Sequence, residues 1–354
     1  MINSDSTSAN GQMTALICER YGGPSALKFV QLPRPEPKRG DVLIRVMAST
    51  ITSGDRRIRS LDMPTGFRNL GRLALGWNGP RNPILGAAFA GVVQAVGSHS
   101  NGFKVGDAVF GFSGFRMGGH AEYLCMSVKG AIAHKPQFLS FEEAAALPFG
   151  GGTALFFLKR AGLRPNETIL INGASGNVGM AVVQLACDLG SAVTGVCSSA
   201  HLAKVRSLGA TRMIDYQKED FTDTSYRFDV VLDVACNHTV ERCLNVLKPG
   251  GRLVRLQAGL PEILKSLLLP RRAGRHVIVG TAEEKTDHLK HLADLVRQGR
   301  YRPVISRVFL FQDAIHAHQY ADGGDFGGSV VIRMGSVAGN GELAQQSGSL
   351  KDYA

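Results

Sequence analysis

Apolar and polar positions in the middle of the chain form a strand–turn–helix pattern. An apolar, β-branched run at residues 168–172 ends in a glycine-rich turn at 173–179, after which apolar residues recur at helical spacing as far as Leu189. Gly190 stands where a helix would end. A strand, a glycine turn and a helix in this order present backbone N–H groups and a helix N-terminus to a pyrophosphate. The pattern therefore predicts a dinucleotide-binding βαβ unit, whereas glycines alone would also fit a plain turn.

The glycine turn also predicts how the chain would contact that ligand. Gly173, Gly176 and Gly179 suit the tight turn, the close approach of a phosphate and the contact between helix and strand. Their spacing is Gly-x-x-Gly-x-x-Gly, which differs from the commoner fingerprint that begins Gly-x-Gly. The residues of the turn that we expect to bind the dinucleotide are Gly173, Ser175, Gly176, Asn177, Val178 and Gly179.

Apolar runs after this unit continue the alternation of strands and helices. Residues 229–234 are almost continuously apolar, which is typical of a strand buried on both faces of a parallel sheet. Residues 247–251 combine a helix stop with a turn. We predict strands at 192–196, 212–216, 229–234, 252–257 and 276–279 and a helix at 202–208. This order predicts an α/β fold, a Rossmann-type doubly wound parallel sheet that binds its ligand at the carboxyl ends of the strands.

The chain on either side of this region has the pattern of short strands. Residues 15–46 hold β-like runs interrupted by glycines and prolines, and residues 91–111 continue the pattern with tight glycine turns. Residues 302–334 predict a strand, a helix and a strand, a segment too short for a core of its own, so we expect it to rejoin the first part. The predicted divisions are a disordered N-terminal extension (1–12), a β-rich substrate domain (13–145), a dinucleotide-binding domain (146–300), a return to the substrate domain (301–334) and a disordered tail (335–354).

The charge of the chain raises the question of a nucleic-acid partner. The formal net charge is +11. Arginines gather in two places, at Arg56, Arg57, Arg59, Arg68 and Arg72 and at Arg271, Arg272 and Arg275. They alternate with apolar residues, and no nucleic-acid-binding module accompanies them. We therefore expect a solvated face or the attraction of an anionic cofactor, and no nucleic-acid partner.

Other features of the composition indicate the compartment. No apolar segment approaches the ~20 residues of a membrane span, so we expect no membrane partner. Residues 1–13 are rich in Ser, Asn and Thr and lack the apolar core of a secretory signal or anchor. The six cysteines include no Cys-x-x-Cys pair. In a chain of 354 residues this predicts reduced thiols in the cytoplasm.

Five short motifs follow one another between Thr14 and Met334. They are Ala48-Ser-Thr-Ile-Thr-Ser-Gly-Asp55, Ile84-Leu-Gly-Ala-Ala-Phe-Ala-Gly-Val-Val93, Gly118-Gly-His-Ala-Glu-Tyr123, Leu147-Pro-Phe-Gly-Gly-Gly-Thr-Ala154 and the glycine turn at Gly173. In this order they resemble the medium-chain dehydrogenase/reductase superfamily, in particular its zinc-independent quinone-oxidoreductase-like branch. The resemblance implies a GroES-like β-barrel substrate domain, a Rossmann domain, a cleft between the two and a homodimer.

The motifs differ from those of zinc-dependent relatives at the positions of the catalytic metal. Those relatives carry Cys in the first motif, His-Glu in the second and Cys or Asp in the fourth. The matching residues here are Thr52, Ala87, Ala88 and Phe149. None of them supplies the thiolate, imidazole or carboxylate that zinc prefers, and the cysteines of a structural zinc lobe are missing from residues 111–119. We expect the lone His120 to pack or hydrogen-bond. The resemblance therefore implies no metal and no zinc.

The end of the second predicted strand bears on the choice between NAD and NADP. NAD-specific sites end that strand with Asp or Glu, which repels a 2′-phosphate. Here Ser198 and Ser199 follow the strand without a carboxylate, and His201 and Lys204 come next. Hydroxyls and positive charges suit a phosphate, so we predict NADPH, the alternative being that His201 and Lys204 face solvent. The resemblance adds Tyr216, where relatives place a tyrosine beside the adenosine phosphate, although those relatives have a lysine near His201.

Without zinc, a hydride acceptor must be activated by hydrogen bonds or by a proton donor. Several zinc-free relatives have a tyrosine two residues after Asp55. Arg57 stands there in this chain, and it stays charged but can polarise a carbonyl oxygen. We expect Asp55 to tie down its loop, and the resemblance places Thr153 near the nicotinamide. The catalytic candidates are Thr52 as a hydrogen-bonding group, Arg57, and Tyr123, which is also a candidate core aromatic. The acid catalyst stays open.

Three functional hypotheses follow. The favoured one is a zinc-independent, NADPH-dependent oxidoreductase that transfers hydride to a small-molecule quinone, enone or related carbonyl acceptor. The second is a zinc-free alcohol/carbonyl oxidoreductase, which would turn over a simple ketone and not an enone. The third is a catalytically inactive NADP-binding structural or sensor protein. This hypothesis stays open because Arg57 stands where several zinc-free relatives have a tyrosine.

Overall fold

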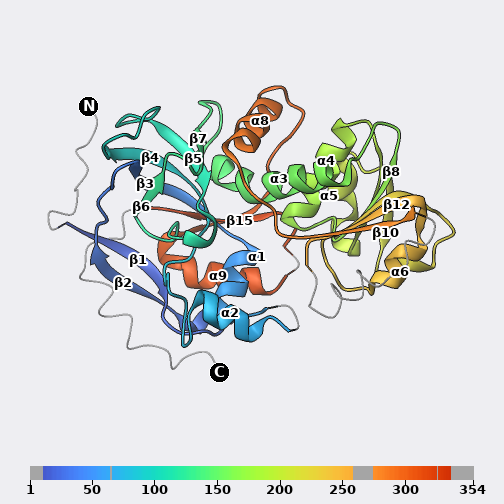
Figure 1. Cartoon of the computed structure of the whole chain (residues 1–354), viewed down its shortest axis with the longest axis horizontal. Helices are drawn as coiled ribbons and strands as arrows, with labels where there is room; N and C mark the ends of the chain where they lie inside the picture. Colours follow the sequence, from blue (N-terminus) through green and yellow to red (C-terminus); the bar gives the residue numbers. More distant parts are fainter. Residues whose placement is uncertain (1–10, 64–65, 258–273, 325, 336–354) are drawn as a thin grey trace.

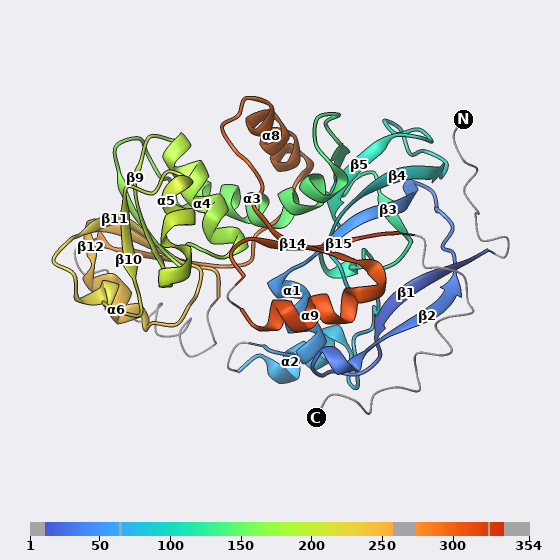
Figure 2. The ribbon, with the colours of Figure 1, turned by 180° about the vertical axis from the view of Figure 1, so that it is seen from behind.

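The computed structural model describes residues 11–63, 66–257, 274–324 and 326–335 (Figure 1). A β-rich lobe and an α/β lobe lie on either side of the long helix α3 (Phe141–Ala161), and the view from behind shows the same arrangement (Figure 2). Strand β1 begins at Gln12, so the last residue of the predicted N-terminal extension belongs to a strand. Residues 1–10 of that extension, nearly all of the predicted tail, and Arg271 and Arg272 lie outside the described residues.

The α/β lobe is built on a six-stranded sheet in the order β10-β9-β8-β11-β12-β13, with every neighbouring pair parallel. This order confirms the predicted doubly wound fold, and β8 and β11 flank the point where the strand order reverses. Its strands are β8 (Thr168–Asn172), β9 (Ala192–Cys197), β10 (Arg212–Asp215), β11 (Phe228–Asp233), β12 (Leu247–Arg255) and β13 (His276–Val279). Its helices are α4 (Asn177–Asp188), α5 (Leu202–Ser207) and α6 (Val240–Asn245), whereas α8 (Thr286–Arg297) packs on α3 and on β7 of the β-rich lobe.

The predicted turn at residues 247–251 is instead part of β12. Phe228 pairs with Leu247, and Val230 pairs with Arg252, so the register of β11 against β12 shifts between the two pairs. The glycines of this segment lie where the register shifts, and Gly250 has a φ of 73° there. The strand therefore continues through residues whose local sequence predicts its interruption.

The β-rich lobe contains a seven-stranded sheet with the path β14-β15-β3-β4-β5-β7, in which β6 also pairs with β3. Strand β15 runs antiparallel to β3, with Val331 opposite Thr50, so the C-terminal segment completes the sheet next to Thr52. The strands of this sheet are β3 (Asp41–Ile51), β4 (Ala88–Val96), β5 (Ala108–Phe112), β6 (Tyr123–Ser127), β7 (Ala131–His134), β14 (Ile305–Leu310) and β15 (Ser329–Arg333). Strands β1 (Gln12–Cys18) and β2 (Leu27–Pro33) form a separate two-stranded antiparallel sheet in the same lobe. The helices are α1 (Ser53–Ser60), α2 (Arg68–Leu75) and α9 (Ala314–Asp322).

Helix α3 joins the two lobes, and the predicted domain boundary between residues 145 and 146 falls inside it. Ser140 and Glu143 form a capping box at its start, and Gly162 ends it in the left-handed conformation. Buried side chains of α3 share a single core cluster with Ala90 and Phe110 of the β-rich lobe and with the α/β sheet. The packing of α3 therefore fixes the position of one lobe against the other.

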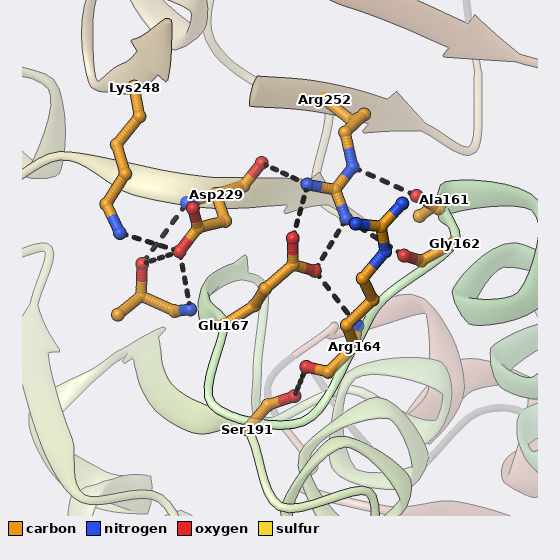
Figure 3. Close-up of polar contacts among 9 residues, drawn as sticks. Ala161, Gly162, Arg164, Glu167, Ser191, Asp229, Lys248 and Arg252 are labelled. Carbon is orange, nitrogen blue, oxygen red and sulfur yellow. Dashed lines mark hydrogen bonds and ion pairs between the residues drawn. The ribbon is translucent and has the colours of Figure 1, made fainter. Parts of the chain in front are cut away.

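A salt-bridge cluster holds the C-terminal end of α3 at the amino edge of the α/β sheet (Figure 3). Arg252 makes two bonds to the Glu167 carboxylate, at 2.9 and 2.7 Å, and donates to the carbonyls of Ala161 and Gly162 at 3.0 and 3.1 Å. The bonds from Arg252 are the main cause that lowers the pKa of Glu167. This cluster lies at the edge opposite to the carboxyl ends of the strands, where ligands bind. Its charges therefore stabilise the fold and are not part of the predicted cofactor site.

None of the helices in the described part of the chain combines the length and the apolar character needed to cross a membrane.

Candidate cofactor and substrate site

The glycine turn between β8 and α4 presents an uncapped helix N-terminus. Gly173 has a φ of 83°, and Gly176 precedes α4 without any side-chain cap. A Cβ at Gly179 would lie 2.1 Å from the Gly173 carbonyl oxygen, so the helix packs directly on the turn. A Cβ at Gly176 would meet only that oxygen, at 3.6 Å, which leaves open space beside the turn. Free first-turn N–H groups and this space fit a pyrophosphate.

A buried polar network lies at the carboxyl ends of β8 and β11. Asn172 Nδ2 donates to Asp233 Oδ1 at 2.8 Å and to Asn237 Oδ1 at 2.7 Å. Arg255, at the end of β12, forms an ion pair with Asp233, with 3.2 Å between Nε and Oδ2. This network was not predicted from the sequence. The feature of the sequence that could have indicated it is the polar residue at the end of each of three apolar strands. The network holds these strand ends together beside the glycine turn.

Arg57 on α1 lies within electrostatic range of the loop that follows β11. Burial is the main cause that lowers the pKa of Arg57, Asp62 opposes it, and the Cys236 thiol is among the groups that act on the guanidinium. Cys236 has a φ of 53°, and its N–H donates to Asp233 Oδ1 at 2.8 Å. An arginine keeps its charge despite such burial. The structure therefore brings the charged candidate Arg57 to the carboxyl edge of the α/β sheet.

Thr52 and Asp55 form a capping box at the start of α1. The Thr52 hydroxyl donates to Asp55 Oδ2 at 2.6 Å, and the Asp55 N–H donates back to that hydroxyl at 3.3 Å. Asp55 Oδ1 accepts from the Gly86 N–H at 2.7 Å, so Asp55 ties down the loop as predicted. Because the Thr52 proton is committed to Asp55, the hydroxyl can only accept a further hydrogen bond.

The residues at the zinc positions of metal-dependent relatives do not form a zinc site. Ala87 and Ala88 have no donor atoms, and the Phe149 ring stacks on Phe112 with 6.1 Å between centroids. His120 is buried against His318, 3.4 Å from Nδ1 to Nε2, and burial lowers its pKa. Within the described ranges no group of three or more His, Cys, Asp or Glu side chains could hold a metal ion. This donor set does not fit zinc.

The predicted adenosine end of the site contains a carboxylate that the sequence analysis missed. The Ser199 hydroxyl donates to Asp215, the last residue of β10, and this bond is the main cause that lowers the pKa of Asp215.

The other residues predicted to bind the 2′-phosphate lie near Gly327 or near Asp215. Lys204 Nζ donates to the Gly327 carbonyl at 2.7 Å, and the His201 ring also lies against Gly327. Tyr216 follows Asp215 and is exposed. Ser198 lies beside them at the end of β9. The signal for Asp215 was an acidic residue at the end of a predicted strand.

Thr153 contacts a second carboxylate that sequence reasoning missed. Its Oγ1 donates to Glu284 Oε1 at 3.2 Å, although the two residues lie 131 positions apart. Burial raises the pKa of Glu284 to about 7, against the opposing effect of the Thr153 hydrogen bond. Thr153 is buried on α3, and Glu284 lies between β13 and α8. This pair places a titratable group next to a predicted site residue.

Tyr123 lies apart from the other candidates. Its ring is covered by the Arg34 guanidinium, 4.1 Å from the ring centroid. It packs on the small core formed by β1 and β2, which includes Ala15 and Ile17. The structure therefore gives Tyr123 the core role that was predicted as the alternative to its role as a donor.

Comparisons with known proteins agree with this architecture. Residues 38–137 match the alcohol dehydrogenase GroES-like domain, and residues 208–332 match a family described as zinc-binding dehydrogenase. A 2-methylene-furan-3-one reductase of Solanum lycopersicum is 33% identical over 93% of this chain and 81% of its own length. An NADPH-dependent alkenal/one oxidoreductase of Arabidopsis thaliana is 30% identical over 91% of this chain and 79% of its own length.

A solved structure supports the same assignment. The quinone oxidoreductase of Coxiella burnetii superposes with a TM-score of 0.80 at 29% identity, covering 91% of this chain and 99% of that protein. The relatives are named as a 2-methylene-furan-3-one reductase, an alkenal/one oxidoreductase and a quinone oxidoreductase. The chain is thus an NAD(P)H-dependent oxidoreductase and belongs to the medium-chain dehydrogenase/reductase superfamily, in its quinone-oxidoreductase-like branch.

Proposed function

We propose that this chain uses NADPH to reduce quinones, enones or related conjugated carbonyl compounds without zinc. The observation that carries the proposal is the replacement of every zinc donor by a residue without the thiolate, imidazole or carboxylate that zinc prefers. Ala87 and Ala88 offer no donor, Phe149 stacks on Phe112, and the Thr52 hydroxyl is bonded to Asp55. A site of this kind lacks a Lewis acid and is more apolar than a zinc site.

The missing Lewis acid favours conjugated acceptors. Zinc contributes several kcal/mol of stabilisation to a developing alkoxide, and that contribution is lost here. Quinones and enones spread the incoming negative charge over a conjugated system, so they depend less on the metal than a saturated ketone does. Arg57 supplies a fixed positive charge at the carboxyl edge of the sheet and is the group we assign to polarising the acceptor oxygen.

The cofactor assignment follows from the glycine turn and from the residues after β9. The N-terminus of α4 fits the pyrophosphate, and NADPH supplies hydride from its nicotinamide ring. We assign the 2′-phosphate to Ser198, Ser199 and Lys204, which follow β9, a strand that ends without a carboxylate. Asp215 accepts the Ser199 bond, so this hydroxyl must turn away from Asp215 to reach a phosphate. One relative named as NADPH-dependent supports the choice of NADPH.

A steady-state comparison of three hydride acceptors and one alcohol tests the proposal. Purified protein and NADPH deuterated at C4 are supplied with a quinone, an enone, a saturated ketone or, with NADP⁺, a primary alcohol. We expect the quinone or enone to be reduced fastest, with a primary isotope effect that identifies hydride transfer. Fastest turnover of the ketone or alcohol would establish the carbonyl/alcohol alternative. Tight NADPH binding without turnover of any acceptor would establish an inactive NADP-binding protein.

Two further properties belong to the same proposal. We propose a homodimer that acts on a small-molecule substrate, and light scattering of the purified protein tests the assembly. A monomer at micromolar concentration would contradict it. Residence in the cytoplasm stays a prediction from the cysteine pattern, and none of the six cysteines, all of which lie in the described residues, forms a disulfide.

A further inference from the structure

Glu284 is a titratable group that the proposed chemistry has not yet used. It lies between the carboxyl end of β13 at Val279 and the start of α8 at Thr286. In doubly wound sheets, ligands bind at this edge. Its side chain packs on α3 at Gly152, where an added Cβ would come within 3.2 Å of Glu284 Cγ. The carboxyl group therefore lies between α3 and the edge of the sheet that faces the predicted cofactor.

The two carboxyl oxygens of Glu284 have different surroundings. Oε1 accepts the Thr153 hydroxyl at 3.2 Å. Oε2 is buried, and no hydrogen-bond partner for it exists in the described part of the structure. A buried carboxylate with one neutral donor is unfavourable, so this environment favours the protonated acid. The pKa of about 7 that burial gives to Glu284 means that it can both hold and release a proton near neutral pH.

No neighbouring charge controls the protonation of Glu284. The titratable or charged groups on its own segment, on α8 and on α3 are Glu283, Lys285, Asp287, His288, Lys290, His291, Asp294, Arg297, Glu142, Glu143, Lys159 and Arg160. Glu283 and Lys285 pair with each other in solvent at 3.1 Å. Across the described residues, no ion pair reaches Glu284, and burial and Thr153 are the causes acting on its pKa. A charged ligand bound nearby can therefore change the protonation of Glu284.

Thr153 lies on the face of α3 that contacts both lobes. Phe149, one helical turn earlier, stacks on Phe112 of the β-rich lobe. Gly150 lies against the Asn177 side chain at the start of α4, where an added Cβ would be 2.2 Å from Oδ1. The Thr153 hydroxyl is thus placed between the substrate lobe and the glycine turn. An acceptor has to lie there to receive hydride from a dinucleotide bound at that turn.

We propose that Glu284 is the proton source of the reduction, with the Thr153 hydroxyl as its relay to the acceptor; this rests on the proposed function. For the transfer, the Thr153 hydroxyl turns its proton from Glu284 Oε1 to the acceptor, and Oε1, now carrying the acid proton, donates to Thr153 Oγ1. The Glu284 O–H bond breaks as Thr153 Oγ1 gains that proton. The original Thr153 proton forms the O–H bond of the acceptor, which has gained two electrons with the hydride. NADPH is oxidised and the acceptor reduced. Glu284 is left as a carboxylate, and water returns its proton after product release.

Cofactor binding tests the position of Glu284 without any turnover. Dissociation constants of NADP⁺ and NADPH are measured by fluorescence titration between pH 5.5 and 8.5. A Glu284 carboxylate would attract the cationic oxidised ring, so the ratio of the NADP⁺ to the NADPH constant should fall about tenfold as pH rises through 7. The 2′-phosphate titrates equally in both cofactors and cancels from the ratio. Glu284→Gln should give a flat ratio.

Kinetics test the transfer itself. In the wild type, the rate of acceptor reduction should fall about tenfold per pH unit above pH 7, because Glu284 must carry its proton. Glu284→Gln should lower the rate about 10²–10⁴-fold and remove this pH dependence. Thr153→Val should behave like Glu284→Gln, and Thr153→Ser should keep most of the wild-type rate. Glu283→Gln, in the adjacent exposed ion pair, is the matched control and should resemble the wild type in both assays.

The outcomes separate this inference from the proposed function. An active enzyme whose rate and pH profile are unchanged in Glu284→Gln would overturn the role of Glu284 and leave the proposed function intact. If no acceptor is reduced, the proposed function fails, and the binding ratio then decides whether Glu284 faces the nicotinamide. A pH-independent ratio in the wild type would overturn that placement. Equal loss in Thr153→Ser and Thr153→Val would exclude the hydroxyl relay.

Discussion

Asp233 and Arg255 form an ion pair that is almost completely removed from solvent, with side-chain exposures of 0% and 1%. The pair joins the carboxyl ends of β11 and β12, and Asp233 also accepts from Asn172 at the end of β8. Removing one partner of such a pair leaves an uncompensated buried charge. The three strand ends that border the cofactor turn therefore depend on this contact.

The first prediction is that Arg255→Met lowers the free energy of unfolding by about 3–5 kcal/mol. Urea denaturation measured by circular dichroism would determine the change. The control is Arg300→Met, which breaks an ion pair with Asp188 in which Arg300 is about half exposed, and should cost about 1 kcal/mol or less. Equal losses in the two variants would show that burial of the Asp233 pair does not matter.

The second prediction distinguishes two glycines of the same turn. Gly179→Ala should destabilise the fold by about 1–3 kcal/mol, because the new Cβ would lie 2.1 Å from the Gly173 carbonyl oxygen. Gly176→Ala should leave stability nearly unchanged, because its Cβ meets no atom closer than 3.6 Å. It should still weaken NADPH binding about tenfold, which is about 1.4 kcal/mol, by occupying the space of the phosphate. Unchanged affinity in Gly176→Ala would place the pyrophosphate elsewhere.

The third prediction concerns the 2′-phosphate. The wild type should bind NADPH more tightly than NADH, and Lys204→Met should lower NADPH affinity about tenfold because it removes a charge-assisted contact. Asp215→Asn should strengthen NADPH binding relative to NADH, since it removes a carboxylate and frees the Ser199 hydroxyl. Isothermal titration at fixed salt would give these constants. Equal NADH and NADPH constants in the wild type would refute the assignment of this phosphate site.

The features that local sequence determines were predictable. Apolar runs and the glycine turn indicated the strands of the α/β sheet, because its inner strands β8 and β11 are buried on both faces and the turn needs a positive φ at Gly173. Helix α3 was not predicted, since Pro148 and the glycines at 150–152 are poor helix formers. The structure accepts those glycines because Asn177, Leu292 and Glu284 pack where their side chains would be.

The polar contacts of the site depend on residues that are distant in sequence. Asn172 and Asp233 are 61 positions apart, and Thr153 and Glu284 are 131 positions apart. Nothing in the sequence near either member of a pair identifies the other. A carboxylate such as Glu284 resembles a solvated surface residue until the fold buries it, and Thr52 resembles a free hydroxyl until its capping bond to Asp55 is seen.

The fourth prediction is that the purified protein contains no stoichiometric zinc and keeps its activity with chelators. Thr52, Ala87, Ala88 and Phe149 replace the donors of metal-dependent relatives, and the Thr52 hydroxyl is already bonded. Elemental analysis by plasma mass spectrometry would measure zinc per chain, and reduction of an enone would be followed before and after chelation. About one zinc per chain, together with loss of activity on its removal, would contradict the prediction.

The last prediction uses stability to measure the protonation of Glu284. Its pKa is about 7 in the folded chain and near 4.5 when unfolded, so the folded state binds more protons between these values. The contribution of Glu284 to the unfolding free energy should therefore decline as pH rises from about 4.5 to 7, by about 3 kcal/mol in all. Glu284→Gln cannot ionise, so its stability relative to the wild type should increase over that range and stay constant above it.

Urea denaturation of the wild type, Glu284→Gln and Glu283→Gln at pH 5, 6, 7 and 8 would measure this difference. Glu283 is exposed and paired with Lys285, so Glu283→Gln should run parallel to the wild type across the series. Titration of other groups cancels in each comparison, because the variants differ from the wild type at one carboxyl group. Parallel curves for the wild type and Glu284→Gln would mean that Glu284 ionises with an ordinary pKa. It would then already be a carboxylate at neutral pH and would have no proton to give to an acceptor.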